Sequence, residues 1–547
     1  MPHRCLAQES FFDARFAAPD CLVEGTLEWL LAERRDQLMP GWLFGGWSGE
    51  GRRGRDAWPA SVLMTMLVLR HAHGPMSLVE TQRRAKCDLT WRAAMGLALD
   101  KPTPSERTLR RFQAFLQTRH PAVGERRYVL LHEHWARLCL ADPDVGVGSN
   151  WVADSTPMWC FGATRGTVRL LGDGLRALVQ RWSRWTKTPL EQSAREWSVP
   201  FVLAKSTKGA FHIDWKDADA RHEVVDELAR SVLRVAKEIR SRLGEVPRAS
   251  FRKKLLQRSR HLLKVVADDL EQDDHGRWIV ARRTTPGRLV SVTDPQARHS
   301  RKSKSVCFKG FKLHLLGEVD SGLIASIAVT PANMHDGKVA PRLVRRATRL
   351  GAQLDRLLGD TAYGSASFRH HLRVVHDIDL CAPPPPATHA SKSFRKEQFD
   401  VDFEREVAIC PAGIESSSPT RRWSKKHRAH YSVYRWPKAT CDACPLTAQC
   451  RTGTTSTWAR RLALHPFEPE VREGHAKWSD PRVRQAYRTR SQGERLIREA
   501  TRRGGRRAAA WGLQSAHRDV HLIASANNLA LLARAEARRR RTVDRAA

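Results

Sequence analysis

The 547-residue sequence has no run of apolar residues long enough to cross a membrane. A membrane-spanning helix needs about 18 or more consecutive apolar residues, and no stretch of the chain reaches that length. The first ten residues also lack the apolar segment that marks a secretory signal peptide. We therefore expect a protein whose work involves no membrane.

The sequence also lacks the cysteine pattern of a secreted, disulfide-bonded domain. It has 11 cysteines, an odd number, and seven of them are scattered singly along the chain. Disulfide frameworks of secreted domains usually pair an even number of cysteines at recurring spacings. No internal repeat is visible either. We expect the protein in the reducing cytoplasm, associated with the nucleoid because of the charge described next.

Acidic residues are scarce relative to basic ones. The chain has 94 Lys and Arg against 58 Asp and Glu, which gives a formal net charge of +36 and a pI near 10.6. An excess of this size favours a polyanionic partner, above all nucleic acid. The alternative is a basic protein that is merely soluble. The local concentration of arginine, with 17 Arg against five acids in residues 481–547, favours the nucleic acid.

The chain is too long for one hydrophobic core, and two to four domains are expected. Helical periodicity covers residues 1–140 and 170–274. Strand patterns fall at 145–154, 288–295, 308–316 and 323–329, the last two as a hairpin. An alternation of helix (338–350), strand (354–359), helix (365–376) and strand (377–381) follows. Residues 385–475 are expected to be irregular, with helices at 480–503 and 516–541.

The helical N-terminal region ends in a basic helix. Residues 104–112 begin with Pro-Ser-Glu and place Arg107, Arg110 and Arg111 near one side of that helix. Short helices that end in a basic one suit docking on DNA. A helical packing or dimerisation domain with a solvated charged face is an equally good interpretation.

Three acidic residues stand out by their context. Asp154 and Asp360 each follow an apolar run that predicts a buried strand, and we expect both at the ends of strands. Glu494 lies in a basic helical pattern. Taken singly, each has an ordinary structural explanation, as a turn or cap residue or as an exposed partner of an arginine four residues away. Together, carboxylates from two strands and a helix can hold divalent metal for phosphodiester chemistry.

The sequence resembles bacterial insertion-sequence transposases of the DDE type, and is most similar to the branch usually numbered eleven-eighty-two. The similarity covers most of the chain. It lies in the strings at 55–69, 104–112, 154–157 (Asp-Ser-Thr-Pro), 291–298, 330–337 and 359–364 (Gly-Asp-Thr-Ala-Tyr-Gly). The resemblance implies an α/β fold with an RNase H-like mixed-sheet catalytic core, and a catalytic triad at Asp154, Asp360 and Glu494. It also implies Mg²⁺ or Mn²⁺, with two ions in the site.

The same resemblance suggests a domain organisation, with a helical DNA-binding or assembly domain at 1–143 and a catalytic core at 144–169 and 285–384. A helical insertion would occupy 170–284 and a cysteine-rich insertion 385–475. Residues 476–547 would complete the core and end in a basic tail.

In the last helix, the family signature runs Tyr, two residues, Arg, three residues, Glu, six residues, Lys. Tyr487, Arg490 and Glu494 match it, whereas Thr501 stands at the lysine position, followed by two arginines. Steps of three, four and seven place these positions on one helical face. We expect DNA contacts from this helix and from the strand at 308–316, where His314 is a further candidate for DNA contact or support. The full set of expected DNA-binding residues is Tyr487, Arg490, Arg498, Arg502, Arg503, Arg107, Arg110, Arg111 and Lys312.

A group of cysteines occupies the segment expected to be irregular. Cys441 and Cys444 have the Cys-x-x-Cys spacing of structural zinc sites, with Cys410 before them and Cys450 after. Four thiolates can bind Zn²⁺ tetrahedrally. The alternative is four buried or free thiols, and the long gap after Cys410 weakens the zinc interpretation. The same cysteine pattern occurs in the transposases that the chain resembles.

The resemblance implies a transposase that binds the terminal inverted repeats of its element, cleaves DNA and joins the exposed 3′-hydroxyl to target DNA. It also implies a homodimer or larger assembly on paired double-stranded DNA ends. Two alternatives remain open on the sequence. One is an RNase H-like nuclease without strand transfer, and the other is an inactive, zinc-containing DNA-binding protein.

Overall fold

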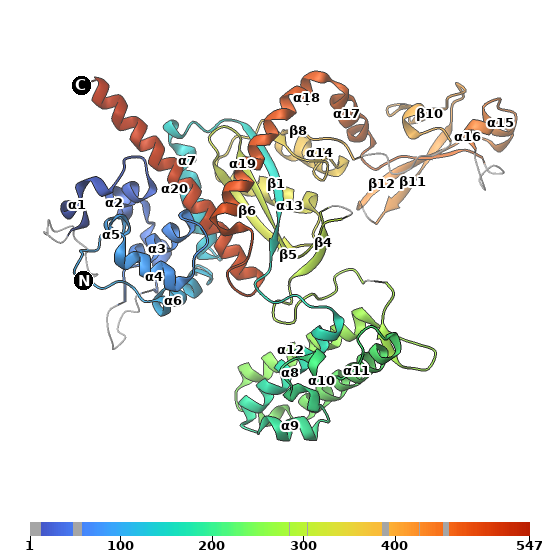
Figure 1. The fold of residues 1–547 in the computed structure, drawn as a ribbon. Helices are drawn as coiled ribbons and strands as arrows, with labels where there is room; N and C mark the ends of the chain where they lie inside the picture. The colour runs from blue at the N-terminus through green and yellow to red at the C-terminus, as the bar shows by residue number, and fades with distance from the viewer. Residues whose placement is uncertain are drawn as a thin grey trace.

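The computed structural model of the protein describes residues 13–47, 57–283, 285–302, 305–385, 393–425, 427–451 and 459–546. A mixed sheet lies at its centre, with the N-terminal helices on one side (Figure 1). A separate bundle of helices and a thin β-ribbon extend from it in two other directions (Figure 1). Arg55 and Asp56, the first two residues of one family-like string, lie outside the described residues. None of the described helices is long and apolar enough to cross a membrane.

The central sheet combines antiparallel and parallel strands. β5 pairs antiparallel with β1 on one side and with β4 and β6 on the other, and β1 continues parallel to β7, which is parallel to β8. This order confirms the mixed α/β sheet that the sequence predicts. The strands are β1 (Asn150–Trp159), β4 (Arg298–Arg301), β5 (Cys307–Glu318), β6 (Ile324–Pro331), β7 (Arg356–Leu358) and β8 (Asp379–Cys381). The helices between them are α13 (Asp336–Arg349) and α14 (Ala366–His371).

Two strand predictions were wrong. The first strand begins at Asn150 and runs to Trp159, so Asp154 lies in mid-strand and not at its end; Val145 belongs to a preceding 3₁₀ turn. Residues 288–295 form no strand. There the Ser291 hydroxyl accepts from the Asp294 N–H (3.1 Å), and the Asp294 carboxylate accepts from the Gly512 N–H (3.2 Å). Such side-chain bonds satisfy the backbone in place of a strand ladder.

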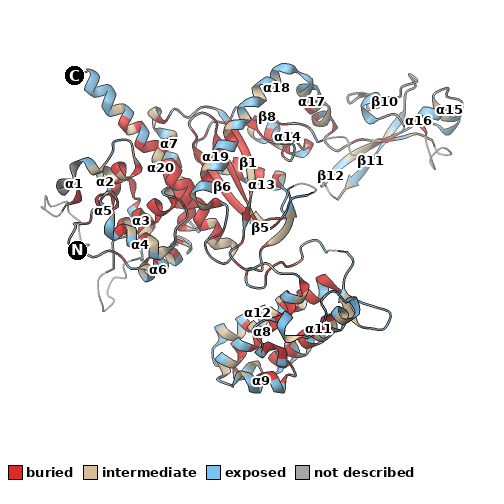
Figure 2. Cartoon of the chain, viewed as in Figure 1, coloured by how far each residue is buried: buried red, intermediate tan, exposed pale blue. Residues whose placement is uncertain are grey.

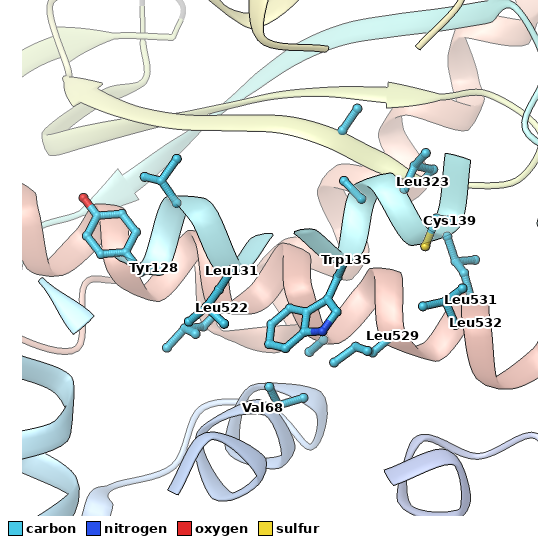
Figure 3. Packing of buried hydrophobic residues seen from close by; sticks show 14 of the residues in the cluster. Val68, Tyr128, Leu131, Trp135, Cys139, Leu323, Leu522, Leu529, Leu531 and Leu532 are labelled. Carbon is cyan, nitrogen blue, oxygen red and sulfur yellow. The ribbon is translucent and has the colours of Figure 1, made fainter. Parts of the chain in front are cut away.

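The N-terminal helices share one hydrophobic core with the sheet. α7 and the long C-terminal helix α20 pack against each other and both contact β6, and Figure 3 shows Trp135 of α7 beside Leu529 of α20, with Val68 of α3 below. Trp135 is fully buried, and its indole N–H donates to the Leu38 carbonyl (2.9 Å). Ser77 caps the start of α4 and Ser105 caps the start of α6, each by accepting from a backbone N–H in the first turn. The helices are α1 (Ala14–Ala17), α2 (Leu27–Leu38), α3 (Ala60–Ala72), α4 (Leu78–Cys87), α5 (Leu89–Met95), α6 (Glu106–Leu116) and α7 (Arg127–Ala141).

The helical segment between β1 and β4 has a hydrophobic core of its own. Its apolar side chains, from Leu170 to Leu289, form a cluster separate from those of the sheet. Gly174 allows close packing there, because a Cβ at this position would meet Leu262 Cδ2 at 2.3 Å. The elements are α8 (Thr167–Thr186), α9 (Leu190–Glu196), α10 (Thr207–Ala210), α11 (Ala218–Ser241), α12 (Ala249–Asp269) and the hairpin β2 (Leu270–Gln272) and β3 (Trp278–Val280).

The segment expected to be irregular contains two small sheets. Its short strands gather a compact core around Phe399, Tyr434 and Trp436, whereas the ribbon of β11 and β12 is mostly exposed (Figure 2). The strands were missed because they are short and their outer faces are polar. The elements are β9 (Asp400–Asp402), β10 (Val407–Ile409), β11 (Ser417–Ser424), β12 (Ala429–Arg435), α15 (Lys438–Asp442), α16 (Thr447–Cys450) and β13 (Arg461–Ala463).

The C-terminal region consists of four helices that return to the sheet. α18 and α19 are joined by a 3₁₀ turn over Arg488–Arg490, within the segment for which one helix is predicted. A π-turn over Thr501–Gly505 ends α19, and Gly504 adopts a left-handed φ of 109° there. The helices are α17 (Glu468–Ser479), α18 (Pro481–Tyr487), α19 (Ser491–Ala500) and α20 (Leu513–Ala546).

Candidate active site

Asp154 lies on the central strand of the sheet, among apolar residues. Asp154 is only 8 % exposed. Strand β1 is paired on both sides, with Asp154 opposite Leu315 of β5. The carboxylate Oδ1 accepts from the Ser155 N–H at 2.7 Å. A buried carboxylate held by the middle of a central strand has a rigid position, which suits a metal ligand.

Asp360 follows the neighbouring strand β7, in the turn after its last residue. In the parallel pair, Val152 of β1 is opposite Leu358 of β7. Asp154, still within β1, and Asp360, in the turn after β7, each lie two residues beyond this pair. The Asp360 carboxylate accepts from the Ala362 N–H (2.8 Å), which fixes the turn after β7. The expectation that Asp360 follows a strand is confirmed.

Glu494 comes from α19, which crosses β1 at close range. Gly493 makes this approach possible, because a Cβ there would meet Val152 Cγ2 at 2.6 Å. One turn later, Leu496 packs over Gly317 of β5, where a Cβ would meet its Cδ1 at 2.5 Å. The two glycines let the helix backbone rest on the sheet. Glu494 thus projects beside Asp154, with its own side chain 71 % exposed.

Arg490 joins two of these acids. Its guanidinium donates to Asp154 Oδ2 at 3.2 Å and lies 3.7 Å from Glu494 Oε1. One cation therefore reaches the carboxylates of both residues. We call Asp154, Asp360 and Glu494 the carboxylate cluster.

The charges within the carboxylate cluster influence one another. Burial raises the pKa of Asp154, the Arg490 guanidinium opposes that rise, and the negative charges of Asp360 and Glu494 add to it. The buried hydroxyl of Tyr363 has a pKa well above its usual value, raised by burial and by nearby acids that include Asp154 and Asp360. The site therefore favours a cation, since bringing the acids together costs free energy unless positive charge accompanies them.

The structure adds residues that the sequence analysis did not single out. Asp336 accepts from the Ser155 hydroxyl (2.9 Å) and from Lys312 Nζ (2.6 Å). His314 is fully buried against the same group, 3.8 Å from Asp336 Oδ1, and burial lowers its pKa to about 4. Tyr363 is the other addition. Both Asp336 and Tyr363 lie inside sequence strings that resemble the transposase family, so these strings were the signal that could have indicated them.

Some of the expected DNA-binding side chains are exposed, and others are buried or already bonded to neighbouring residues. Lys312 is bound to Asp336 and only 16 % exposed. Arg503 donates to the Ala72 carbonyl (3.2 Å) and is largely buried. Tyr487 is half-buried, with its ring edge-on to Trp478. Arg498 of α19 and Arg502 of the following π-turn are exposed, and Arg502 pairs with Glu499 at 2.9 Å.

The three basic residues of α6 all face solvent. Arg107, Arg110 and Arg111 are exposed, and Arg110 pairs with Glu106 one turn earlier. The structure does not bring them to the carboxylate cluster. Thr501, at the position of the family lysine, points back to its own helix, where its hydroxyl donates to the Arg498 carbonyl (2.9 Å).

The four cysteines expected to bind zinc surround one small space. Cys410, Cys441, Cys444 and Cys450 are free thiols that line a cavity of about 30 Å³, together with Trp436 and neighbours. Burial raises the pKa of Cys450, and the other three thiols raise it further, against an opposing effect of Arg460. The Cys410 N–H donates to the Ile414 carbonyl in a tight turn. We call this the cysteine cavity.

Neither group is arranged as a finished metal site. Within the described ranges, no three His, Cys, Asp or Glu side chains are positioned to hold a metal ion together. The donor chemistry fits nonetheless in both places. The carboxylate cluster offers hard oxygen donors, two of which already share one guanidinium, and the cysteine cavity offers four soft sulfur donors around a common space.

Two family models match the chain. One is described as Transposase DDE domain and matches residues 409–533, and the other as Transposase domain (DUF772) and matches residues 31–114. No curated protein and no solved structure matches the chain. The similarity to the branch numbered eleven-eighty-two stays a prediction. The first match contains Glu494 and α19, and the second contains helices α3 to α6. Together the two matches support a DDE-type transposase of insertion sequences.

Proposed function

We propose that the protein is a transposase that binds the terminal inverted repeats of its element, cleaves a phosphodiester there and joins the exposed 3′-hydroxyl to target DNA. The observation that carries the proposal is the convergence of Asp154, Asp360 and Glu494. They come from a central strand, the adjacent strand end and a crossing helix, and they interact electrostatically. Such a gathering of acids in a chain of net charge +36 needs a functional reason.

The carboxylate cluster would hold divalent metal. Asp154 and Asp360 supply the ligands fixed by the sheet, and Glu494 supplies one from α19. Mg²⁺ or Mn²⁺, with two ions as the expected number, would activate the attacking oxygen and stabilise the leaving oxygen of an in-line displacement. Both DNA cleavage and strand transfer are displacements of this kind, so one site serves both.

Other side chains prepare the site. Arg490 favours the ionised form of the buried Asp154, because its positive charge opposes the rise in pKa caused by burial. Asp336 pairs with Lys312 and accepts a hydrogen bond from the Ser155 hydroxyl. Among the described residues, Asp154 is left with two hydrogen bonds: Oδ1 accepts from the Ser155 N–H, and Oδ2 accepts from Arg490. In this proposal Arg490 and Tyr487 would contact DNA beside the carboxylates.

The cysteine cavity would hold a structural Zn²⁺. Its four thiols surround the space, and a structural zinc can supply folding free energy to a small segment with little apolar content. The surrounding core of this segment is small, as the short cluster around Phe399 shows. We further propose that two copies of the chain act on paired DNA ends.

A cleavage and strand-transfer assay tests the proposal. The substrate is a duplex that carries one end of the DNA bracketing the gene, with Mg²⁺ and labelled target DNA. We expect cleavage at the end and joined products with the natural chain, and neither with Asp154→Asn or Asp360→Asn. Cleavage without joining would favour the nuclease alternative. Normal cleavage by both variants would refute the assignment of the carboxylates.

A further inference from the structure

A large cleft lined by arginines lies between α19 and α20. Its volume is about 610 Å³, and the turn between β5 and β6 also lines it. α19 and the residues just after it form one wall, and α20 forms the other. The basic side chains are Arg495, Arg498, Arg502 and Arg503 on the first wall and Arg534 and Arg538 on the second.

The positive charges of the cleft are mostly unbalanced. Six arginines line it, against the two acids Asp320 and Glu499. Glu499 is bound by Arg502 at 2.9 Å and approached by Arg503 at 3.9 Å. The other four arginines form no ion pair with any residue that the structure describes. Two of these four donate only to backbone carbonyls, Arg495 at the turn and Arg538 at Asp144.

The two walls repel each other in the absence of an anion. Burial lowers the pKa of Arg534, and the positive charges of Arg538 and Arg495 lower it further, against a weaker effect of Glu499. Arg503 behaves in the same way, with Arg534 among the cations that lower its pKa. A protein gains nothing in stability from such crowding, so an anionic ligand is the simplest explanation of the arrangement.

The spacing of the arginines suits a polymer of phosphates. Arg495 and Arg498 are three residues apart on α19, Arg502 follows four residues later in the π-turn, and Arg534 and Arg538 are four residues apart on α20. Residues at this spacing lie on one helical face, about 5–6 Å apart. Arg498 also lies one turn after Glu494, so the cleft opens beside the carboxylate cluster.

We propose that this cleft binds the sugar–phosphate backbone of the DNA strand that runs past Glu494, with α20 contributing two of the six arginines. The inference rests on the proposed function, because it assigns the DNA a path from the carboxylate cluster to the C-terminal helix. It also gives α20, otherwise a core helix, a direct role in binding. A guanidinium contacts a phosphate irrespective of base, so the cleft would act on any sequence.

The test is a salt titration of DNA binding. A fluorescein-labelled duplex of arbitrary sequence is bound without divalent metal across a series of KCl concentrations, and the association constant is followed by anisotropy. For the double variant Arg534→Gln/Arg538→Gln we expect binding about tenfold weaker for each arginine. The slope of log K against log[KCl] should become shallower by about two, one for each lost phosphate contact.

Matched variants separate the cleft from general charge and from misfolding. Arg545→Gln removes one exposed arginine from the same helix outside the cleft, and it should leave the slope within about one of the natural chain. Arg534→Lys/Arg538→Lys keeps the charge and should restore the slope. Thermal unfolding checks that every variant is folded. An unchanged slope in the double Gln variant, or an equal loss in Arg545→Gln, would overturn the inference.

A second arm asks whether the anion is DNA or free phosphate. Inorganic phosphate is added at constant ionic strength, and the melting temperature is followed. If phosphate stabilises the natural chain but not the double Gln variant, while both bind DNA equally, the cleft holds a small anion and the proposal falls. The catalytic proposal fails independently, since it would show as normal cleavage by Asp154→Asn, whatever the slopes.

Discussion

The carboxylate cluster and the cysteine cavity are two candidate metal sites built in opposite ways. The carboxylate cluster draws on β1, the turn after β7 and α19, so its members are separated by more than a hundred residues and meet only when the sheet is complete. The cysteine cavity takes all four thiols from residues 410–450, beside a small core of its own. One site depends on the whole fold, and the other depends on a local segment.

We therefore expect the carboxylate cluster to act in catalysis and the cysteine cavity to stabilise one segment of the fold. Asp154 is buried in the central sheet, and both its burial and the negative charges of Asp360 and Glu494 raise its pKa, so the cluster favours positive charge. The thiols sit in a segment that extends away from the sheet (Figure 1). Substitutions in the carboxylate cluster should therefore stop catalysis while the protein stays folded. Substitutions in the cysteine cavity should loosen one segment and affect catalysis less.

The largest effect is expected from Glu494→Gln. Removing the one negative charge that α19 brings to the cluster should lower the rate of single-turnover DNA cleavage by about 10³-fold, because each metal ligand supports several kcal/mol of transition-state stabilisation. Glu191→Gln, on the exposed surface of α9, is the control and should cleave normally. Equal rates for both variants would remove Glu494 from the site.

The approach of α19 to the sheet is tested by Gly493→Val. The added side chain would collide with Val152 and lift the helix from β1. We expect a loss of about 1–3 kcal/mol in the free energy of unfolding from overpacking, and about 10²-fold slower cleavage from the displaced Glu494. Gly166→Ala, where a Cβ meets nothing within 4 Å, should change neither quantity. Normal cleavage by Gly493→Val would show that the close contact is dispensable.

The cysteine cavity is tested by Cys441→Ser/Cys444→Ser. Zinc content, measured by atomic absorption, should fall from one ion per chain to none, and the segment should become sensitive to proteolysis. Cleavage should slow by about tenfold at most, since the thiols lie outside the carboxylate cluster. Cys307→Ser, an exposed cysteine of β5, should keep the zinc. A natural chain purified without any zinc would refute this site.

The smallest effect concerns stability and pH. Burial raises the pKa of Asp154 in the folded state, so protonated Asp154 contributes stability that is complete below the unfolded pKa and is lost as pH rises through the folded pKa. Asp154→Asn stays neutral throughout. Without metal, the variant should therefore gain stability over the natural chain as pH rises, which denaturant titrations at several pH values can measure. A constant difference across pH would mean that Asp154 is not destabilised by its charge.

Much of the fold follows from the sequence because its signals are local. The hairpin of β5 and β6 and the alternation from α13 to β8 fall where strand and helix periodicity place them. Two strand predictions were wrong because local turns and side-chain hydrogen bonds form there instead. Ser291 and Asp294 bond to the main chain and replace a predicted strand, and the apolar run before Asp154 begins in a turn rather than in β1.

Part of the candidate site could be predicted from the sequence. Asp360 and Glu494 lie on the elements that their patterns predict, and the spacing of the four cysteines predicts their proximity. The link of Asp336 to Ser155 and Lys312 could not be foreseen, because it depends on the register of β1 against β5 and on the start of α13. The arginine cleft could not be foreseen either, since the arginines of its two walls are more than thirty residues apart in the sequence and come together only in the folded chain.

The most direct test of the central claim is a count of bound Mn²⁺, made by electron paramagnetic resonance on the zinc-loaded protein. We expect the natural chain to bind Mn²⁺ and the double variant Asp154→Asn/Asp360→Asn to lose that binding while it melts at no lower temperature. Equal Mn²⁺ binding by the two proteins would contradict the claim that these carboxylates hold the metal.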